Sequence, residues 1–242
     1  MIFWYVLGGA TGIVLGYVLF LCVCALLVDP RKEYENHSNF YRFLLDSTTA
    51  VAMKLLRIRV HVSGGELVPR DEKVLFVCNH RSNYDPIVTW YAFRKNKIAF
   101  ISKAANFKIP VFGRLIRKCC FMAIDRENPR NAILTIQKAA RLLQNGEVCV
   151  GVYPEGTRSK TGVLLPFHNG VFKIAQKAGV SVVVLHVSGT ERIAKRTPFR
   201  ATDVRIKVLD VISSQRVCGE KTDMIGAYVR RLMENETERN EN

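Results

Sequence analysis

The chain has 242 residues, 48% of them hydrophobic, which is enough to bury one sizeable core. Its formal net charge of +15 favours anionic partners such as phospholipid headgroups, nucleic acid or acidic carrier molecules. Seven cysteines are scattered without any C-x-x-C pair, which excludes a disulfide framework and cysteine zinc spacing and fits a reducing compartment.

Residues 1–28 contain no charged side chain, and this run exceeds the roughly 20 apolar residues that a membrane span requires. It is longer than a signal-peptide core and ends in a poor cleavage pattern, so we expect an uncleaved transmembrane anchor; a cleaved signal or a buried helix is the alternative. Arg31 and Lys32 follow at once, which predicts a single-pass protein of the cell membrane with its main domain on the cytoplasmic face. Gly8, Gly12 and Gly16 indicate either a helix-mediated homodimer or ordinary glycine use in a span.

The next segment, residues 29–57, mixes apolar and basic residues at helical spacing, for example Phe43 and Leu44 with Arg42 and Lys54. We assign it to an amphipathic helix associated with the membrane surface, with packing on the core as an equal alternative. Residues 58–233 then form the main domain, and residues 234–242, all of which are polar, are expected to be a solvated tail.

Within the main domain, short apolar runs alternate with helical patterns. The predicted strands are 58–63, 74–78, 98–101, 121–124, 148–152, 182–187 and 204–209, and the predicted helices are 86–94, 104–118, 129–145, 169–178 and 221–233. Such alternation is typical of an α/β domain with a central, mostly parallel sheet flanked by helices.

A histidine and an aspartate stand five residues apart in the stretch "NHRSNYD", which follows the predicted strand 74–78. If residues 81–84 form a turn, Asp85 can orient the imidazole of His80, which then acts as a general base. Ser82 is not clearly presented as a nucleophile, so this arrangement fits direct attack by a substrate hydroxyl. Two alternatives remain. Asp85, followed by Pro86, is also a good N-cap for a helix. A zinc site is the other alternative, but zinc would need further ligands beside His80 and Asp85.

A second polar stretch, "YPEGTRS" at residues 153–159, follows the predicted strand 148–152. Backbone N–H groups and the guanidinium of Arg158 at a strand end can bind an anion. A turn without function is the alternative, and the Gly-Lys-Ser/Thr of a phosphate loop is absent.

These stretches resemble the motifs of the glycerolipid acyltransferase family, specifically of the 1-acyl-sn-glycerol-3-phosphate acyltransferases. The first motif, N-H-x4-D, is matched by Asn79, His80 and Asp85, and the third by residues 153–159. Between them, "KIPVFG" at 108–113 and "IDR" at 124–126 are similar to the second motif. The chain departs from the family at Cys120 and Ala123, where glycine and an aromatic residue are usual, and at Val184, which replaces the proline of a fourth motif ending "SGT".

The resemblance implies transfer of a fatty acyl group from acyl-CoA or acyl-carrier protein to the sn-2 hydroxyl of lysophosphatidic acid, which gives phosphatidic acid. His80 would be the general base and Asp85 would orient it. Substrate contacts are implied for the remaining motif residues, with the two arginines on the phosphate: Asn79, Arg126, Glu155, Gly156, Thr157 and Arg158. No metal or other cofactor is expected, and the partners would be membrane phospholipids and the two substrates.

Two other functions stay open. The acceptor can be a different lysophospholipid or a lyso-aminolipid, or the chain can be a membrane-anchored protein that binds anionic lipid without catalysis. Nucleic acid is not expected, because the sequence contains no recognisable nucleic-acid-binding module.

Overall fold

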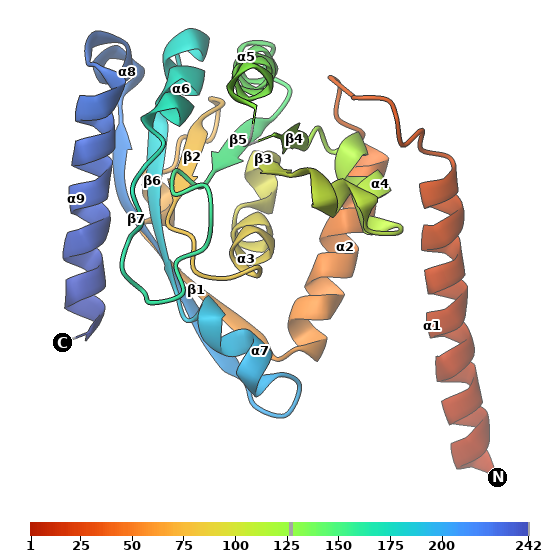
Figure 1. The fold of residues 1–242 in the computed structure, drawn as a ribbon. Helices are drawn as coiled ribbons and strands as arrows, with labels where there is room; N and C mark the ends of the chain where they lie inside the picture. Colours follow the sequence, from red (N-terminus) through yellow and green to blue (C-terminus); the bar gives the residue numbers. More distant parts are fainter. Residues whose placement is uncertain (126–127, 242) are drawn as a thin grey trace.

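The computed structural model describes residues 1–125 and 128–241. Its centre is a sheet with the strand order β1-β7-β6-β2-β5-β3-β4, in which β6 and β7 are antiparallel and the other neighbours are parallel (Figure 1). The mostly parallel sheet is therefore confirmed. The strands are β1 (Ile58–Ser63), β2 (Leu75–Cys78), β3 (Ile98–Lys103), β4 (Met122–Ile124), β5 (Cys149–Val152), β6 (Val182–Ser188) and β7 (Thr202–Ile212).

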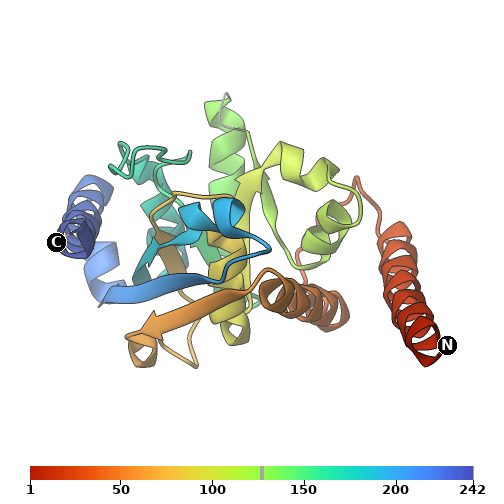
Figure 2. The ribbon, with the colours of Figure 1, turned by 90° about the horizontal axis from the view of Figure 1, so that it is seen from below.

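Helices cover both faces of this sheet, because alternate residues of the inner strands point to opposite sides. Phe76 and Cys78 of β2 belong to one core, while Leu75 and Val77 belong to the other. The first core packs against α2 (Asn39–Leu55), α3 (Asp85–Ala92) and α4 (Phe112–Lys118). The second packs against α5 (Pro129–Gln144), α6 (Lys173–Ala178), α8 (Ser214–Gly219) and α9 (Thr222–Glu241), so the domain has three layers, visible from below in Figure 2.

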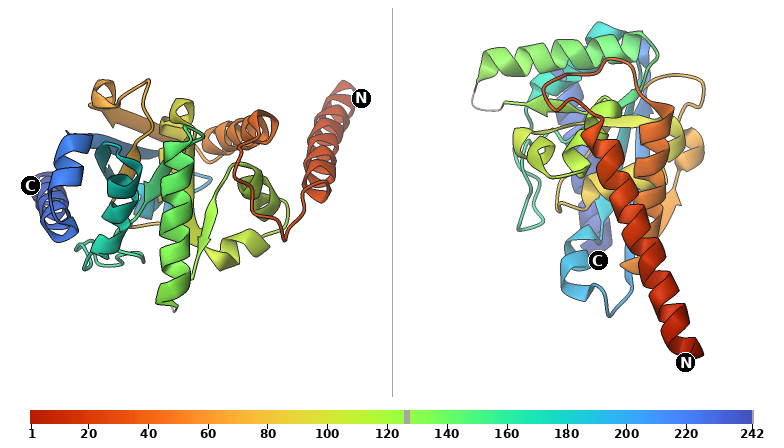
Figure 3. Two further views of the ribbon diagram at one scale, coloured as in Figure 1. Left: turned by 90° about the horizontal axis from the view of Figure 1, so that it is seen from above. Right: turned by 90° about the vertical axis from the view of Figure 1, so that its right-hand side faces the viewer.

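Helix α1 (Ile2–Leu26) runs beside this body and is attached to it near its C-terminal end (Figure 3). Leu21, Cys24 and Ala25 are buried there, and the Tyr41 hydroxyl donates to the Cys24 carbonyl at 2.9 Å. Within residues 1–125 and 128–241, no helix combines the length and the apolar character that crossing a membrane requires. The transmembrane anchor predicted over residues 1–28 is thus not supported by the structure.

The amphipathic segment proves to be α2, whose apolar side packs on the core through Leu44, Leu45 and Met53. Arg42, which was expected on a basic face, is 4% exposed and lies over the Trp90 ring at 4.6 Å. Four large apolar side chains of α2 remain exposed: Phe40, Phe43, Val51 and Leu55. The core-packing alternative is therefore observed for one side of this helix.

Residues 234–241 of the predicted polar tail continue α9 through Glu241. Ion pairs hold this last part: Arg230 pairs with Glu234 one turn later, and Lys207 of β7 binds Glu236 at 2.7 Å. Thr237 also contacts His186 of β6 at 3.1 Å. A polar sequence thus remains helical where its charges meet partners on the helix and the neighbouring sheet.

Candidate active site

Three neighbouring strands bring the motifs together. β5, β2 and β6 are adjacent and parallel, so their carboxyl ends lie at one edge of the sheet. The loop after β2 carries His80, the loop after β5 carries Glu155, and the turn after β6 carries Thr190. In open α/β sheets, binding sites lie at this edge.

His80 and Asp85 form a close pair. Nδ1 of His80 lies 2.8 Å from Oδ2 of Asp85, and the aspartate side chain is 1% exposed. The same oxygen accepts the backbone N–H groups of Arg81 and Ser82, each at 2.7 Å. A carboxylate can only accept, so the His80 proton is on Nδ1 and Nε2 is left as the basic atom. The predicted approach of the two side chains is present, and the turn runs from Ser82 to Asp85, where the Asp85 N–H donates to the Ser82 carbonyl at 3.3 Å.

The N-cap alternative for Asp85 is wrong. Asp85 is the first residue of α3, whose N-cap is Tyr84 without a side-chain cap bond. The carboxylate instead turns back onto the preceding loop, as described above. Ser82 is 8% exposed and its Oγ accepts from the N–H of Tyr84 at 3.2 Å, so it is not presented as a nucleophile.

Glu155 fixes the loop that carries His80. Its buried carboxylate accepts the backbone N–H of His80 at 2.6 Å and that of Leu165 at 2.9 Å. Burial raises the pKa of this carboxyl, and the two backbone hydrogen bonds oppose that rise. A second link runs from the Ser159 N–H to the His80 carbonyl at 2.8 Å. The first and third motifs are therefore joined by the Glu155 carboxylate and by one backbone–backbone hydrogen bond.

Asn79 has a comparable buried role. Its side-chain amide donates to the Val187 carbonyl at 2.9 Å, and its side-chain oxygen accepts the Val187 N–H at 2.7 Å. This pair extends the contact between β2 and β6 by one step beyond the strand end. The predicted substrate contact of Asn79 stays a prediction, while the geometry gives the side chain a positioning role.

Tyr153 packs flat against the His80 imidazole. The rings of His80 and Tyr153 lie 4.2 Å apart with an interplanar angle of 26°, and Tyr153 stacks in turn on Phe100. Burial raises the pKa of the Tyr153 phenol well above its ordinary value, so the phenol stays neutral. The stacking fixes the plane of the imidazole, and the hydrogen bond to Asp85 fixes its orientation within that plane.

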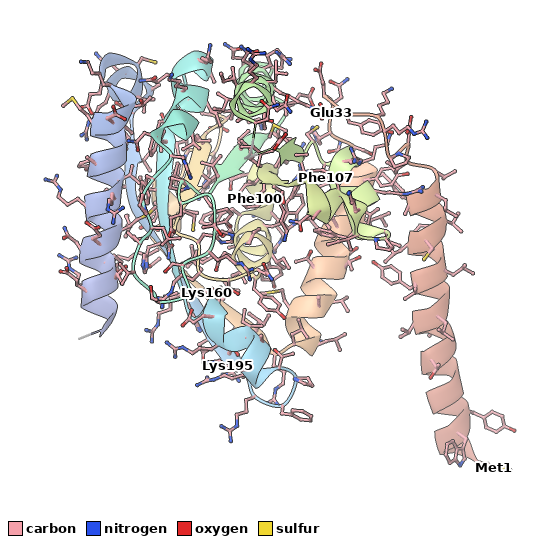
Figure 4. The ribbon with its side chains drawn as sticks, in the orientation of Figure 1. Met1, Glu33, Phe100, Phe107, Lys160 and Lys195 are labelled. Carbon is pink, nitrogen blue, oxygen red and sulfur yellow. The ribbon has the colours of Figure 1, made fainter. Side chains whose placement is uncertain are left out.

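A cavity of about 780 Å³ opens beside His80. Its lining is mainly apolar and comes from α3, β3, α4 and α5, including Ile87, Phe100, Phe112, Ile116 and Ile136; Figure 4 shows Phe100 near the centre of the molecule. The polar lining residues are His80, Asn83, Ser102, Lys103, Asn106, Thr157, Arg158 and His168. The His80 imidazole therefore lies at the wall of a mainly apolar space.

Comparison with known proteins decides the family. The acyltransferase family model matches residues 59–188, which is more than half of the chain and includes both motifs. The chain belongs to the acyltransferase family. This acyltransferase is 30% identical over 161 residues to the 1-acyl-sn-glycerol-3-phosphate acyltransferase of Cocos nucifera, and the match covers 66% of this chain but only 51% of the relative.

Two bacterial proteins are similar over more of their length. The 1-acyl-sn-glycerol-3-phosphate acyltransferase of Haemophilus influenzae is 28% identical over 171 residues, which cover 69% of this chain and 71% of the relative. The crystal structure of the 1-acyl-sn-glycerophosphate (LPA) acyltransferase of Thermotoga maritima superposes with a TM-score of 0.71 at 25% sequence identity. That superposition covers 93% of this chain and 88% of the other, which supports the same α/β fold.

The other predicted site residues of the acyltransferase differ in their position relative to the cavity. Thr157 and Arg158 are exposed and line the cavity. Gly156 has a φ of 67°, and a Cβ atom there would lie 2.9 Å from Cδ2 of His168, so only glycine fits without displacement. Arg126 lies outside the described residues. The departure at Cys120 is also visible, since this buried residue has a φ of 62° where the family pattern has glycine.

Three contributions were missed by sequence reasoning. Thr190 belongs to the "SGT" stretch and donates to Oδ1 of Asp85. The motif gives Tyr153 only its first position, although the ring of Tyr153 stacks on His80. Lys103, at the end of β3, shares the cavity with Arg158 and carries no motif of its own. These residues follow strands that are distant in the sequence, and only the order of the strands in the sheet shows that they lie close to the site.

Proposed function

We propose that this acyltransferase moves a fatty acyl group from acyl-CoA or acyl-carrier protein to the sn-2 hydroxyl of 1-acyl-sn-glycerol 3-phosphate, giving phosphatidic acid. The observation that carries the proposal is the His80–Asp85 pair at 2.8 Å beside an apolar cavity of about 780 Å³. The names of the similar proteins support the choice of acceptor.

The proposed reaction proceeds without a covalent enzyme intermediate. Nε2 of His80 removes the proton from the acceptor hydroxyl as its oxygen bonds to the carbonyl carbon of the thioester. Asp85 stabilises the imidazolium that forms. The tetrahedral intermediate then collapses with cleavage of the carbon–sulfur bond, and the leaving thiolate takes the proton back from His80. The products are the new ester and the free thiol.

The tetrahedral oxyanion needs N–H donors that are not already used. The amides of Arg81 and Ser82 bind Asp85, that of His80 binds Glu155, and that of Gly156 binds the Tyr153 carbonyl at 3.0 Å. We therefore assign the oxyanion to the N–H groups of Thr157 and Arg158, which follow directly and line the cavity.

Each substrate part has a suitable surface. The apolar lining suits an acyl chain, whose burial contributes about 0.8 kcal/mol per methylene group. The exposed Arg158 and Lys103 on the polar side suit the acceptor phosphate, since a guanidinium can bind phosphate through two parallel hydrogen bonds. Glu155 and Asn79 would act by holding the loop that bears His80.

The acceptor is a lipid, so the enzyme is proposed to work at a membrane. The exposed apolar side chains of α1, including Ile13, Val14, Leu15 and Leu19, support contact of this helix with lipid. Arg31 and Lys32 directly after the helix support contact with anionic lipid headgroups.

The decisive experiment is an assay of the purified protein in detergent with lysophosphatidic acid and a set of acyl-CoA and acyl-carrier-protein donors. Formation of phosphatidic acid that requires His80 is the expected result. Other lysophospholipids and a lyso-aminolipid serve as parallel acceptors. Faster acylation of one of these would replace the proposed acceptor, and no acylation of any of them would contradict the enzymatic function.

A further inference from the structure

An exposed phenylalanine projects from the domain at a distance from the substrate cavity. Phe199 lies in the loop between α7 (Ile193–Arg196) and β7, and it is 85% exposed. The loop backbone is held, because Arg57 donates to the Phe199 carbonyl at 3.0 Å and the Arg200 N–H donates to the Arg196 carbonyl at 2.8 Å. A large apolar side chain is thus presented to solvent by an ordered loop.

Basic side chains surround this residue. Arg200 follows it directly, and Arg196 and the exposed Lys195 lie three and four positions before it; Lys195 is at the lower end of the domain in Figure 4. Beside the loop is a hollow of about 160 Å³ lined by three arginines and by few other groups: Ser188, Gly189, Arg192, Arg196, Asp203 and Arg205. We call Arg192, Lys195, Arg196, Phe199, Arg200 and Arg205 the Phe199 surface.

The nearby carboxylates neutralise this surface only in part. Glu191 pairs with Arg192 at 3.3 Å, and Asp203 pairs with His61 at 3.0 Å. The hydrogen bond from His61 lowers the pKa of the Asp203 carboxyl, with Arg59 and Arg196 adding to the effect. The remaining arginines and Lys195 keep the surface positive. It shares no residue with the lining of the substrate cavity.

We propose that the Phe199 surface docks on an anionic phospholipid bilayer, with the phenyl ring in the interfacial region and a lipid phosphate in the arginine-lined hollow. An apolar residue flanked by cations is the combination that membrane surfaces favour. Three guanidinium groups around a small hollow suit a phosphate through paired hydrogen bonds. A purely electrostatic partner would use the arginines but would give the exposed phenyl ring no apolar environment.

The position of the surface supports this partner. The N-terminal end of α1 and the C-terminal end of α2 lie at the same end of the molecule as α7 and its loop (Figures 1 and 3). Apolar side chains are exposed there as well, including Trp4, Tyr5 and Leu55. Contact at the Phe199 surface would give the catalytic domain a second attachment to the membrane and so would fix its orientation.

A position-specific fluorophore tests the contact in the full chain. In a Cys22→Ser, Cys218→Ser background, Phe199→Cys is labelled with an environment-sensitive dye and mixed with phosphatidylcholine vesicles with or without phosphatidylglycerol. The matched control carries the dye at Met224→Cys, a 60% exposed residue at the start of α9, at the other end of the domain. We expect a blue shift and quenching by spin-labelled lipid at position 199 only, and only with phosphatidylglycerol. Equal signals at both positions, or none at position 199, would overturn the proposal.

A charge reversal tests the energetic contribution. Arg200→Glu should weaken binding to the phosphatidylglycerol vesicles by roughly tenfold or more at low salt, because each basic residue near such a surface contributes about 1 kcal/mol. The same change at Lys221→Glu, exposed before α9, should have little effect. Equal weakening by both variants would mean that only net charge matters, which contradicts docking at this surface. These measurements record lipid contact and not turnover, so they are independent of the proposed reaction.

Discussion

Thr190 donates a hydrogen bond to Oδ1 of Asp85 across 105 positions of the chain. Both residues are fully buried, and the other oxygen of Asp85 accepts from His80, Arg81 and Ser82. Both carboxylate oxygens therefore accept hydrogen bonds, and the turn after β6 helps to position the proposed base in the loop that follows β2. The dyad depends on contacts from beyond its own loop.

Thr190→Val tests this contact. Loss of a hydrogen bond to a charged group costs about 1.5–3 kcal/mol, so we expect kcat to fall roughly tenfold to a hundredfold if the bond orients Asp85 during the reaction. Thr190→Ser keeps the hydroxyl and should recover most of the activity. Steady-state kinetics and an unfolding curve of each variant provide the measurement. A Thr190→Val enzyme with normal kcat and lowered stability would show that the contact is only structural.

His80→Ala removes the proposed base. We expect a loss of about 10²–10⁴-fold in kcat, which is the usual contribution of a positioned general base. The fold should persist, because the side chain stacks on Tyr153 at the cavity wall and does not belong to the core clusters. Circular dichroism and turnover of the same preparation give the answer. Near-normal turnover in a folded variant would contradict the assignment.

Arg158→Ala should weaken binding of the phosphate-bearing acceptor more than binding of the acyl thioester. Arg158→Lys should recover only part of the loss, because a lysine cannot reproduce the two parallel hydrogen bonds of a guanidinium. The apparent KM for each substrate is measured for both variants, with Lys103→Ala as the comparison on the same cavity. If the donor KM rises while the acceptor KM stays constant, Arg158 instead contacts the phosphates of the donor's carrier.

Ala132→Phe should shorten the acyl chain that the enzyme prefers. Ala132 lies on α5 and lines the cavity, so a larger side chain there removes apolar space. Competition between a long and a short acyl donor measures the change as a ratio of kcat/KM values. Leu134→Phe on the same helix is the control, because Leu134 is 61% exposed and does not line the cavity. An unchanged ratio for Ala132→Phe would place the acyl chain elsewhere.

Sequence patterns could predict the strands and the dyad because both are local. Each inner strand is a short apolar run, and His80 and Asp85 are separated by a single turn. A local pattern could not exclude the N-cap role of Asp85. In the structure the carboxylate accepts from the preceding N–H groups of Arg81 and Ser82 and does not cap α3. Either direction is compatible with "DP" at a helix start.

The contacts that cross the sheet could not be predicted from local pattern. Thr190 meets Asp85 only because β6 is next to β2, and Glu155 meets the His80 backbone only because β5 is next to β2 on the other side. The burial of Arg42 has a similar cause, because its guanidinium is accommodated by the Trp90 ring and by the carbonyls of Ile98 and Cys119. Pairings of this kind require the strand order.

His186 is a buried titratable group that the reaction does not use. It lies on β6, and its side chain is hydrogen-bonded to Thr237 of α9 through Nε2 at 3.1 Å. Thr237 donates its own proton to the Met233 carbonyl at 2.8 Å, so Nε2 of His186 is the donor in that pair. Burial lowers the pKa of His186 from 6.5 to about 4, with Arg81 and Lys207 adding to the decrease and Glu236 opposing it.

His186→Gln should therefore reduce the loss of stability in acid. A histidine whose pKa is lower in the folded state contributes stability that is present above pH 6.5 and is lost as the pH falls through about 4. The difference corresponds to about 3 kcal/mol at most, because one pKa unit is about 1.4 kcal/mol. Gln keeps an N–H donor for Thr237 but cannot be protonated. Urea unfolding at a series of pH values between 7 and about 4 measures both proteins, and comparison with wild type removes the contribution of the carboxylates that titrate in the same range. Parallel curves for the two proteins would show that His186 is not the group responsible.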